Sequence, residues 1–195
     1  MKIVLASTSE IRRKILIDAG IALSVADSEV DEAEAKKSMG TITPRNLAVE
    51  LAKLKSQKVS RIDPQAMVIG ADQVLGIKGS VFNKPTSRAE AERQLLQLRN
   101  ETHTLFSAVS CAVGGAEIWN HCSEASLTMR NFTDEFLKSY LDANADDCLS
   151  SVGAYKLEKA GIQLFEKING DHFAILGLPM LPLLKFLRER DVIPS

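Results

Sequence analysis

The chain has 195 residues, of which 45% are apolar, 25% charged and 5% aromatic, a composition within the ordinary range of globular proteins. This composition excludes a disordered chain, a collagen and a coiled coil. A chain of this length can bury a sizeable core in one domain without stabilisation by disulfides or metal ions. The chain has 24 Lys and Arg and 25 Asp and Glu, a net charge of -1. Because it lacks the basic excess with which proteins displace counterions from nucleic-acid polymers, we expect any anionic partner to be small.

The cysteines point to a reducing compartment. Cys111, Cys122 and Cys148 are odd in number and far apart, which argues against a disulfide framework and a structural zinc site. The apolar run at residues 3–6 is too short for a signal peptide, and no stretch approaches the ~18 apolar residues of a membrane span. We therefore expect a single domain over residues 1–195, cytoplasmic and without a membrane partner.

The first half of the chain predicts two strands and two helices. A β-branched run at residues 2–6 precedes the polar turn 7–9, and apolar residues at helical spacing then follow over residues 12–19. Thr43 and Pro44 suit the N-cap and first position of a helix to about residue 59. The apolar run at residues 66–70 is typical of a strand buried on both faces. Asp72 follows it, so a carboxylate is delivered to the end of a central strand.

The second half adds hairpins and helices in irregular alternation. A small hairpin is expected over residues 74–81, a helix over 87–99, and a long hairpin from 102–113 and 116–129. Thr133 caps another helix. The remaining elements predicted are a second hairpin from strands at 162–168 and 173–176, and a final helix near 181–190. This order predicts the α/β class with a mixed sheet.

Several polar residues could carry chemistry, and each also has a structural interpretation. The turn Ser7-Thr8-Ser9, followed by Arg12 and Arg13, has the outline of a phosphate site, or else Ser9 only caps a helix. Asp72 could lie at a ligand crevice or be a turn residue. The acidic residues 30–34 could hold a divalent cation with Asp72 or form an exposed loop. Lys55 and Lys84 could bind anions or be solvated.

Together these residues carry a family resemblance. Six blocks occur in the order found in Maf-like nucleoside triphosphate pyrophosphatases, and the resemblance spans about residues 3 to 185. The blocks are LASTSEIRRKIL at residues 5–16, VDE at 30–32, LAKLK at 51–55, IGADQV at 69–74, NKP at 83–85 and GLP at 177–179. The chain therefore resembles a single Maf-like domain.

The resemblance implies hydrolysis between the α and β phosphates of a nucleoside triphosphate, giving a nucleoside monophosphate and pyrophosphate. It assigns the proton-acceptor role to Asp72 and implies a divalent metal, Mg²⁺ or Mn²⁺, at Glu32 and Asp72. The predicted contacts of the triphosphate are the donor-bearing side chains Ser7, Arg12, Lys55 and Lys84. It also implies a fold like that of Maf and inosine triphosphatase proteins, a mixed sheet in two lobes with a nucleotide cleft between them, and a homodimer.

Three positions bear on the base. Gln73 and Glu158 resemble the 7-methyl-GTP pyrophosphatase branch, whereas the dTTP/UTP branch usually has Thr and Gln there. Ile11 departs from the family, which often has Arg or Trp at this position, and so supplies no aromatic face for a purine. The sequence thus favours 7-methyl-GTP, with dTTP/UTP hydrolysis as the alternative. A nucleotide-binding regulator of septum formation, without essential turnover, is a further alternative.

Overall fold

The structure is a computed structural model that describes residues 1–194. The chain divides into two compact units. The first unit comprises Met1–Gln73, Phe106–Ser123 and the chain from Asp171 onward, and the second comprises Val74–Leu105 and Glu124–Gly170. None of the helices within the described residues has the length and apolar character needed to cross a bilayer.

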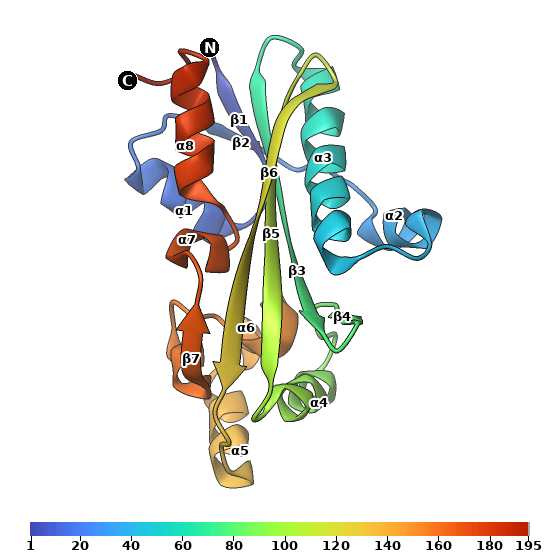
Figure 1. Cartoon of the computed structure of the whole chain (residues 1–195), viewed down its shortest axis with the longest axis vertical. Helices are drawn as coiled ribbons and strands as arrows, with labels where there is room; N and C mark the ends of the chain where they lie inside the picture. Colours follow the sequence, from blue (N-terminus) through green and yellow to red (C-terminus); the bar gives the residue numbers. More distant parts are fainter. Residues whose placement is uncertain (195) are drawn as a thin grey trace. The chain divides into compact units, whose positions relative to one another are not determined.

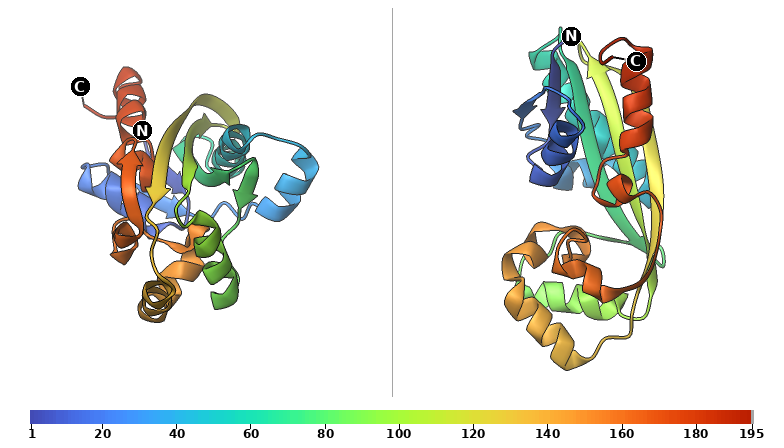
Figure 2. Two further views of the ribbon diagram at one scale, coloured as in Figure 1. Left: turned by 60° about the horizontal axis from the view of Figure 1, so that its bottom comes forward. Right: turned by 90° about the vertical axis from the view of Figure 1, so that its left-hand side faces the viewer.

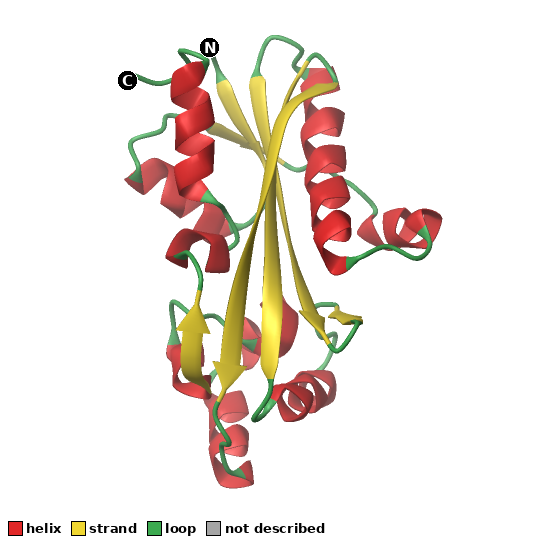
Figure 3. Cartoon of the chain, in the orientation of Figure 1, coloured by secondary structure: helices red, strands yellow, loops and turns green. Residues whose placement is uncertain are grey.

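Within residues 1–194, the strands form one seven-stranded sheet with the order β2-β1-β3-β5-β6-β7, and β4 pairs with β3. β1 pairs in parallel with both β2 and β3, whereas β4 and β7 pair antiparallel with β3 and β6. The sheet is therefore mixed, and the predicted α/β class is confirmed (Figure 3). The strands are β1 (Ile3–Ala6), β2 (Ser24–Ala26), β3 (Met67–Ile77), β4 (Ser80–Phe82), β5 (Thr102–Val113), β6 (Ala116–Met129) and β7 (Phe165–Asn169).

In the first unit, helices cover both faces of the strands. α1 and α8 lie on one side and α3 on the other, with α2 beyond α3 (Figures 1 and 2). Alternate residues of β1 serve the two faces, because Ile3 and Leu5 join the core under α1 and α8 while Val4 and Ala6 pack with α3. The helices of this unit are α1 (Glu10–Asp18), α2 (Glu32–Met39), α3 (Pro44–Ile62), α7 (His172–Ile175) and α8 (Met180–Glu189).

The second unit carries the remaining helices around its own buried residues. Phe132, Leu137 and Leu141 are nearly inaccessible to solvent, and Thr133 caps α5 by accepting the Phe136 N–H, as predicted. The helices of this unit are α4 (Arg88–Leu98), α5 (Asp134–Ala143) and α6 (Ala145–Ser150), with short 3₁₀ turns at Val152–Ala154 and Ala160–Leu164.

The predicted second hairpin is wrong. Its first strand begins only at Phe165 and pairs with β6, and its second strand is the one-turn helix α7. The Asp171 side chain accepts the Ala174 N–H at 2.8 Å, which caps this turn as a helix. A short apolar run such as residues 173–176 cannot distinguish a strand from a buried helix turn by periodicity alone.

A buried histidine in the second unit gives the fold an acid sensitivity. The His103 Nε2 lies 2.8 Å from the Tyr155 hydroxyl, and the rings of Tyr155 and Phe165 pack beside it. Its Nδ1 is buried without a hydrogen-bond partner among the described residues. Burial lowers the pKa of His103 to about 4, so the folded protein holds this ring neutral.

We expect His103→Gln to be less sensitive to acid than the wild type. Because the folded pKa lies below the unfolded value of about 6.5, the unfolded state binds the extra proton, and stability falls as the pH drops from about 6.5 to 4. Between pH 8 and pH 5 this group should cost about 2 kcal/mol of unfolding free energy, measurable by urea titration. The matched control is the exposed His172→Gln, and equal acid sensitivity of wild type and His103→Gln would contradict the expectation.

Candidate functional site

The turn between β1 and α1 presents hydroxyl groups to solvent. The Ser7 Oγ accepts the Ser9 N–H at 3.3 Å, and the Ser9 side chain makes no capping bond to α1, which overturns the interpretation of Ser9 as only a side-chain cap. A cavity of about 450 Å³ opens at this turn, lined by Ser7, Thr8, Ser9, Glu10, Arg13, Leu23, Ser24 and Val25. The hydroxyls, Arg13 and the amino end of α1 together suit an anion.

Arg12 is held by acceptors from three separate segments. Its Nε donates to the Gly177 carbonyl at 2.8 Å, and its Nη1 donates to the Ala71 carbonyl at 3.0 Å and to the Ser7 Oγ at 3.4 Å. Burial lowers the pKa of Arg12, while Asp72 and Glu32 act in the opposite direction. A guanidinium nonetheless stays protonated in proteins, so a fixed positive charge lies beside the β1–α1 turn.

Lys55 joins two carboxylates from distant parts of the sequence. Its Nζ donates to the Glu32 Oε1 and to the Asp72 Oδ1, both at 2.6 Å. Lys55 and Asp72 are buried at 8% and 6% exposure, respectively, which excludes the interpretation of Lys55 as a solvated lysine. Glu32 is the first residue of α2, a helix that buries none of its residues, so this ion pair ties the start of α2 to α3.

A glycine lets α3 lie close to β3. A Cβ on Gly70 would stand 2.3 Å from the Ala52 carbonyl oxygen and 2.6 Å from the Ser56 nitrogen, distances that real Cβ atoms do not reach. Gly70 is two residues before Asp72 on β3, and Ala52 and Ser56 flank Lys55 on α3. The absent side chain therefore sets the approach that brings Lys55 to Asp72.

The electrostatics of Asp72 suit a proton acceptor. Burial raises the pKa of Asp72 above its usual range, and Lys55 and Arg12 lower it in part. A carboxylate whose pKa is raised by burial is a stronger base than an exposed one, and the two neighbouring cations favour its charged form. Asp72 can therefore accept a proton from a bound water.

The two carboxylates on Lys55 also fit a hard divalent cation. Glu32 and Asp72 already share one positive charge, the Lys55 ammonium, and oxygen ligands suit Mg²⁺ or Mn²⁺. Among residues 1–194 no cluster of three or more His, Cys, Asp or Glu side chains forms a ready-made metal cage. Because Mg²⁺ is usually held by one or two carboxylates with water and substrate oxygens, this donor set fits an ion that arrives with a polyphosphate.

Gln73 and Ile11 have other contacts within the first unit. The Gln73 amide nitrogen donates to Ser107 and to two carbonyls of α7, and Ile11 packs against the core of the first unit. Lys84 and Glu158 belong to the second unit and are exposed. The first unit thus brings together Ser7, Arg12, Glu32, Lys55 and Asp72. The roles of Lys84 in triphosphate binding and of Glu158 in base recognition stay predictions.

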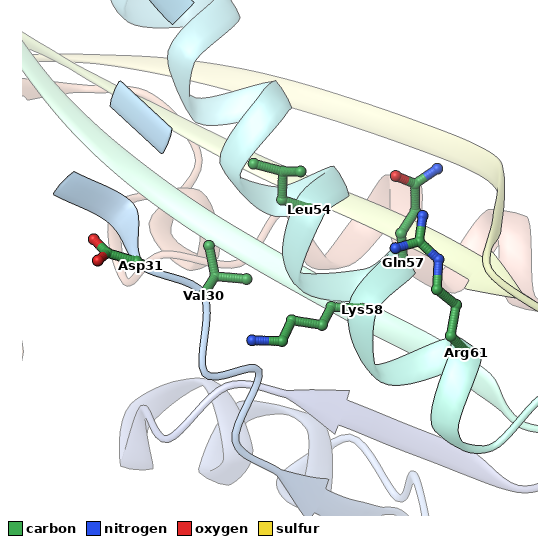
Figure 4. A pocket seen from close by; sticks show the side chains of 6 residues that line it. All are labelled: Val30, Asp31, Leu54, Gln57, Lys58 and Arg61. Carbon is green, nitrogen blue, oxygen red and sulfur yellow. The ribbon is translucent and has the colours of Figure 1, made fainter. Parts of the chain in front are cut away.

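A second hollow lies one turn further along α3. Figure 4 shows the residues around it, and its volume is about 250 Å³. Lys58 donates to the Glu29 carbonyl here, which anchors the segment before α2. The lining residues are Val30, Asp31, Leu54, Gln57, Lys58 and Arg61. Asp31 also caps α2 by accepting the Glu34 N–H at 2.9 Å, so a helix begins at Glu32, while Asp31 and Glu34 are exposed.

The fold and the site define a class of protein, an α/β protein with a hydroxyl-rich turn after β1, an arginine and a lysine-bridged pair of carboxylates. Asp72 lies within β3 (Met67–Ile77) and not at its end, so the predicted end of this strand is wrong, because the strand continues into its pairing with β4. The chain belongs to the Maf-like protein family, whose model matches residues 2–190.

Its relatives agree with this membership. A nucleoside triphosphate pyrophosphatase of Paramagnetospirillum magneticum is 48% identical, covering 97% of this chain and 100% of that one. A 7-methyl-GTP pyrophosphatase of Rhizobium johnstonii is 46% identical, covering 98% of both chains. One of Brucella abortus is 45% identical, covering 99% and 98%. A solved HAM1 protein structure from Coxiella burnetii has a TM-score of 0.45 and 12% identity, over 68% of this chain and 74% of that one.

Proposed function

We propose that the chain is a nucleoside triphosphate pyrophosphatase that hydrolyses the α–β phosphoanhydride to a nucleoside monophosphate and pyrophosphate. The observation that carries the proposal is the buried Asp72, held with Glu32 on Lys55 and close enough to Arg12 to interact electrostatically. Such a site offers a base for water and positive charge for phosphates. The relatives named nucleoside triphosphate pyrophosphatase and 7-methyl-GTP pyrophosphatase support the same activity.

In the proposed reaction, Asp72 accepts a proton as a water oxygen attacks phosphorus. A new P–O bond forms, the bond to the bridging oxygen breaks, and pyrophosphate leaves with the bonding electrons. Arg12 and the hydroxyls of the β1–α1 turn bind the phosphate oxygens and favour the charge that develops on them. Lys84 remains a predicted further contact to the triphosphate.

We propose Mg²⁺ or Mn²⁺ as the cofactor, held by Glu32 and Asp72. When bound, such an ion lowers the pKa of water and polarises phosphoryl oxygens. Lys55, which already bonds to both carboxylates, keeps them oriented for the cation. We propose a homodimer on the family resemblance, and a cytoplasmic location on the three free cysteines.

The hydrogen bonds of Gln73 leave it an acceptor that suits a guanine base. Its amide nitrogen is engaged with Ser107, Ala174 and Ile175, so only its carbonyl oxygen, an acceptor, can serve a ligand. Guanine presents two adjacent donors, N1–H and the 2-amino group, whereas uracil and thymine present one donor between two acceptors. A carboxylate such as Glu158 can accept both guanine donors, and it favours the positive ring of 7-methylguanine.

We expect 7-methyl-GTP to give the highest kcat/KM among 7-methyl-GTP, GTP, UTP, CTP and dTTP, measured by pyrophosphate release with Mg²⁺. Glu158→Gln should lower the preference for guanine over pyrimidine nucleotides by roughly tenfold, because a charge-assisted hydrogen bond is lost. The exposed Glu166→Gln is the matched control. A wild type that favours pyrimidines would support the dTTP/UTP alternative. Nucleotide binding without pyrophosphate release would support the regulator.

A further inference from the structure

The carbonyl that orients Arg12 lies directly after a short helix. Gly177 follows α7, a helix of only four residues, and its carbonyl accepts the Arg12 Nε–H at 2.8 Å. Gly177 has φ +99°, and a Cβ there would stand 3.2 Å from the Arg12 Nε. The backbone itself therefore lies against the guanidinium, and the placement of α7 sets the direction of Arg12.

Two side chains of the central strands bind the end of α7. The Ser107 Oγ, on β5, donates to the Ala174 carbonyl at 2.6 Å. The Gln73 Nε2, on β3, donates to the Ser107 Oγ and the Ile175 carbonyl, both at 2.9 Å, and to the Ala174 carbonyl at 3.2 Å. Because these partners all act as acceptors, the Gln73 amide can point only its nitrogen at α7.

One carbonyl connects this network to Arg12. The Ala174 oxygen also accepts the Gly177 N–H at 2.9 Å, so Ser107 and Gly177 share an acceptor. The last carbonyls of a helix lack hydrogen-bond partners within it. Ser107, which is 1% exposed, supplies a donor for one of these carbonyls from β5. A path of three hydrogen bonds thus joins Ser107, Ala174, Gly177 and Arg12.

We propose that Ser107 is a positioning residue for Arg12, because with Gln73 it fixes α7 and so the Gly177 carbonyl that aims the guanidinium. The role of Arg12 toward a triphosphate rests on the proposed function. The positioning itself is a property of the first unit and can be measured without any substrate.

The first experiment observes Arg12 directly. The Arg12 Nε–H signal in a ¹H–¹⁵N NMR spectrum, assigned by its loss in Arg12→Lys, should be slow to exchange with solvent in the wild type. Ser107→Ala should shift it and speed its exchange roughly tenfold, whereas Ser107→Thr, which keeps the hydroxyl, should restore most of the protection.

Ser110→Ala is the matched control. Ser110 lies on the same strand at 0% exposure and also makes two hydrogen bonds, to Ser56 and Glu117, none of which involves α7. Its replacement should leave the Arg12 signal unchanged. An unchanged signal in Ser107→Ala, or an equal change in both alanine variants, would overturn the positioning role.

The second experiment measures affinity for guanosine 5′-[(α,β)-methylene]triphosphate, which cannot be cleaved at the α–β position, by calorimetry. Ser107→Ala should weaken binding roughly tenfold in the wild-type background, and have no further effect in Arg12→Ala, because the two residues act through one network. An undiminished effect in Arg12→Ala would overturn the proposal. Absence of pyrophosphate release by the wild type would count against the proposed function instead, since the Arg12 signal still tests Ser107.

Discussion

Asp72→Asn is expected to reduce kcat by at least ~10²–10⁴-fold, the usual cost of losing a general base. The amide has the shape of the carboxylate but cannot accept the proton, and it is a weaker ligand for a divalent cation. Pyrophosphate release measures the loss. Mn²⁺ affinity, followed by electron paramagnetic resonance, should fall in the same variant, which separates the cofactor proposal from the role of the base.

The pH profile supplies an independent check of the same residue. Because burial raises the pKa of Asp72 and the base must be deprotonated to act, kcat/KM should rise with pH and reach its plateau above the range of an ordinary aspartate, about 3.9. The matched control is Asp63→Asn, which removes only a surface ion pair with Lys2. Wild-type rates in Asp72→Asn with an unchanged melting curve would exclude Asp72 as the base.

Lys55→Met should cost about 3 kcal/mol of unfolding free energy at pH 8, because it leaves the buried Asp72 carboxylate without its closest counter-charge. The loss depends on pH. Removing Lys55 raises the folded pKa of Asp72 further above its unfolded value of about 3.9, so stability is retained where both states are protonated and is lost as the pH rises through the folded pKa. Urea titrations at pH 5 and pH 8 should therefore show the larger deficit at pH 8.

The double variant Lys55→Met/Asp72→Asn tests the cause of that loss. With the buried charge removed as well, stability at pH 8 should recover most of the deficit and lose its pH dependence. Lys53→Met, two residues earlier and partly exposed, is the control for replacing a lysine of α3. A double variant no more stable than Lys55→Met would show that packing of the lysine stem, and not the ion pair, accounts for the effect.

Local patterns in the sequence predict most of the fold. The hairpin strands at residues 102–113 and 116–129 have the predicted bounds, since Gly114-Gly115 interrupts two long runs of strand-forming residues. Thr43 and Thr133 cap α3 and α5 as expected. α2 and α6 carry no strong apolar periodicity and were not predicted, because one buries no residue and the other only Cys148.

The candidate site is predicted less completely, because long-range contacts create it. The family blocks identify Glu32, Lys55 and Asp72. They do not show that the Lys55 ammonium binds both carboxylates, because this contact depends on the packing of α3 against β3. Ser107 carries no sequence signal, since a serine in an apolar strand is equally typical of a satisfied core residue. The Gly177 carbonyl is a backbone group, which no residue type can indicate.

The close approach at Gly70 has a consequence for how this protein can vary. Glycine there takes no part in proton transfer or phosphate binding, yet any side chain would push α3 away from β3 and separate Lys55 from Asp72. We therefore expect amino-acid substitution at position 70 to be as restricted as substitution of the reacting groups themselves. Proteins that descend from this one and retain its site are expected to keep a glycine here as strictly as they keep the aspartate.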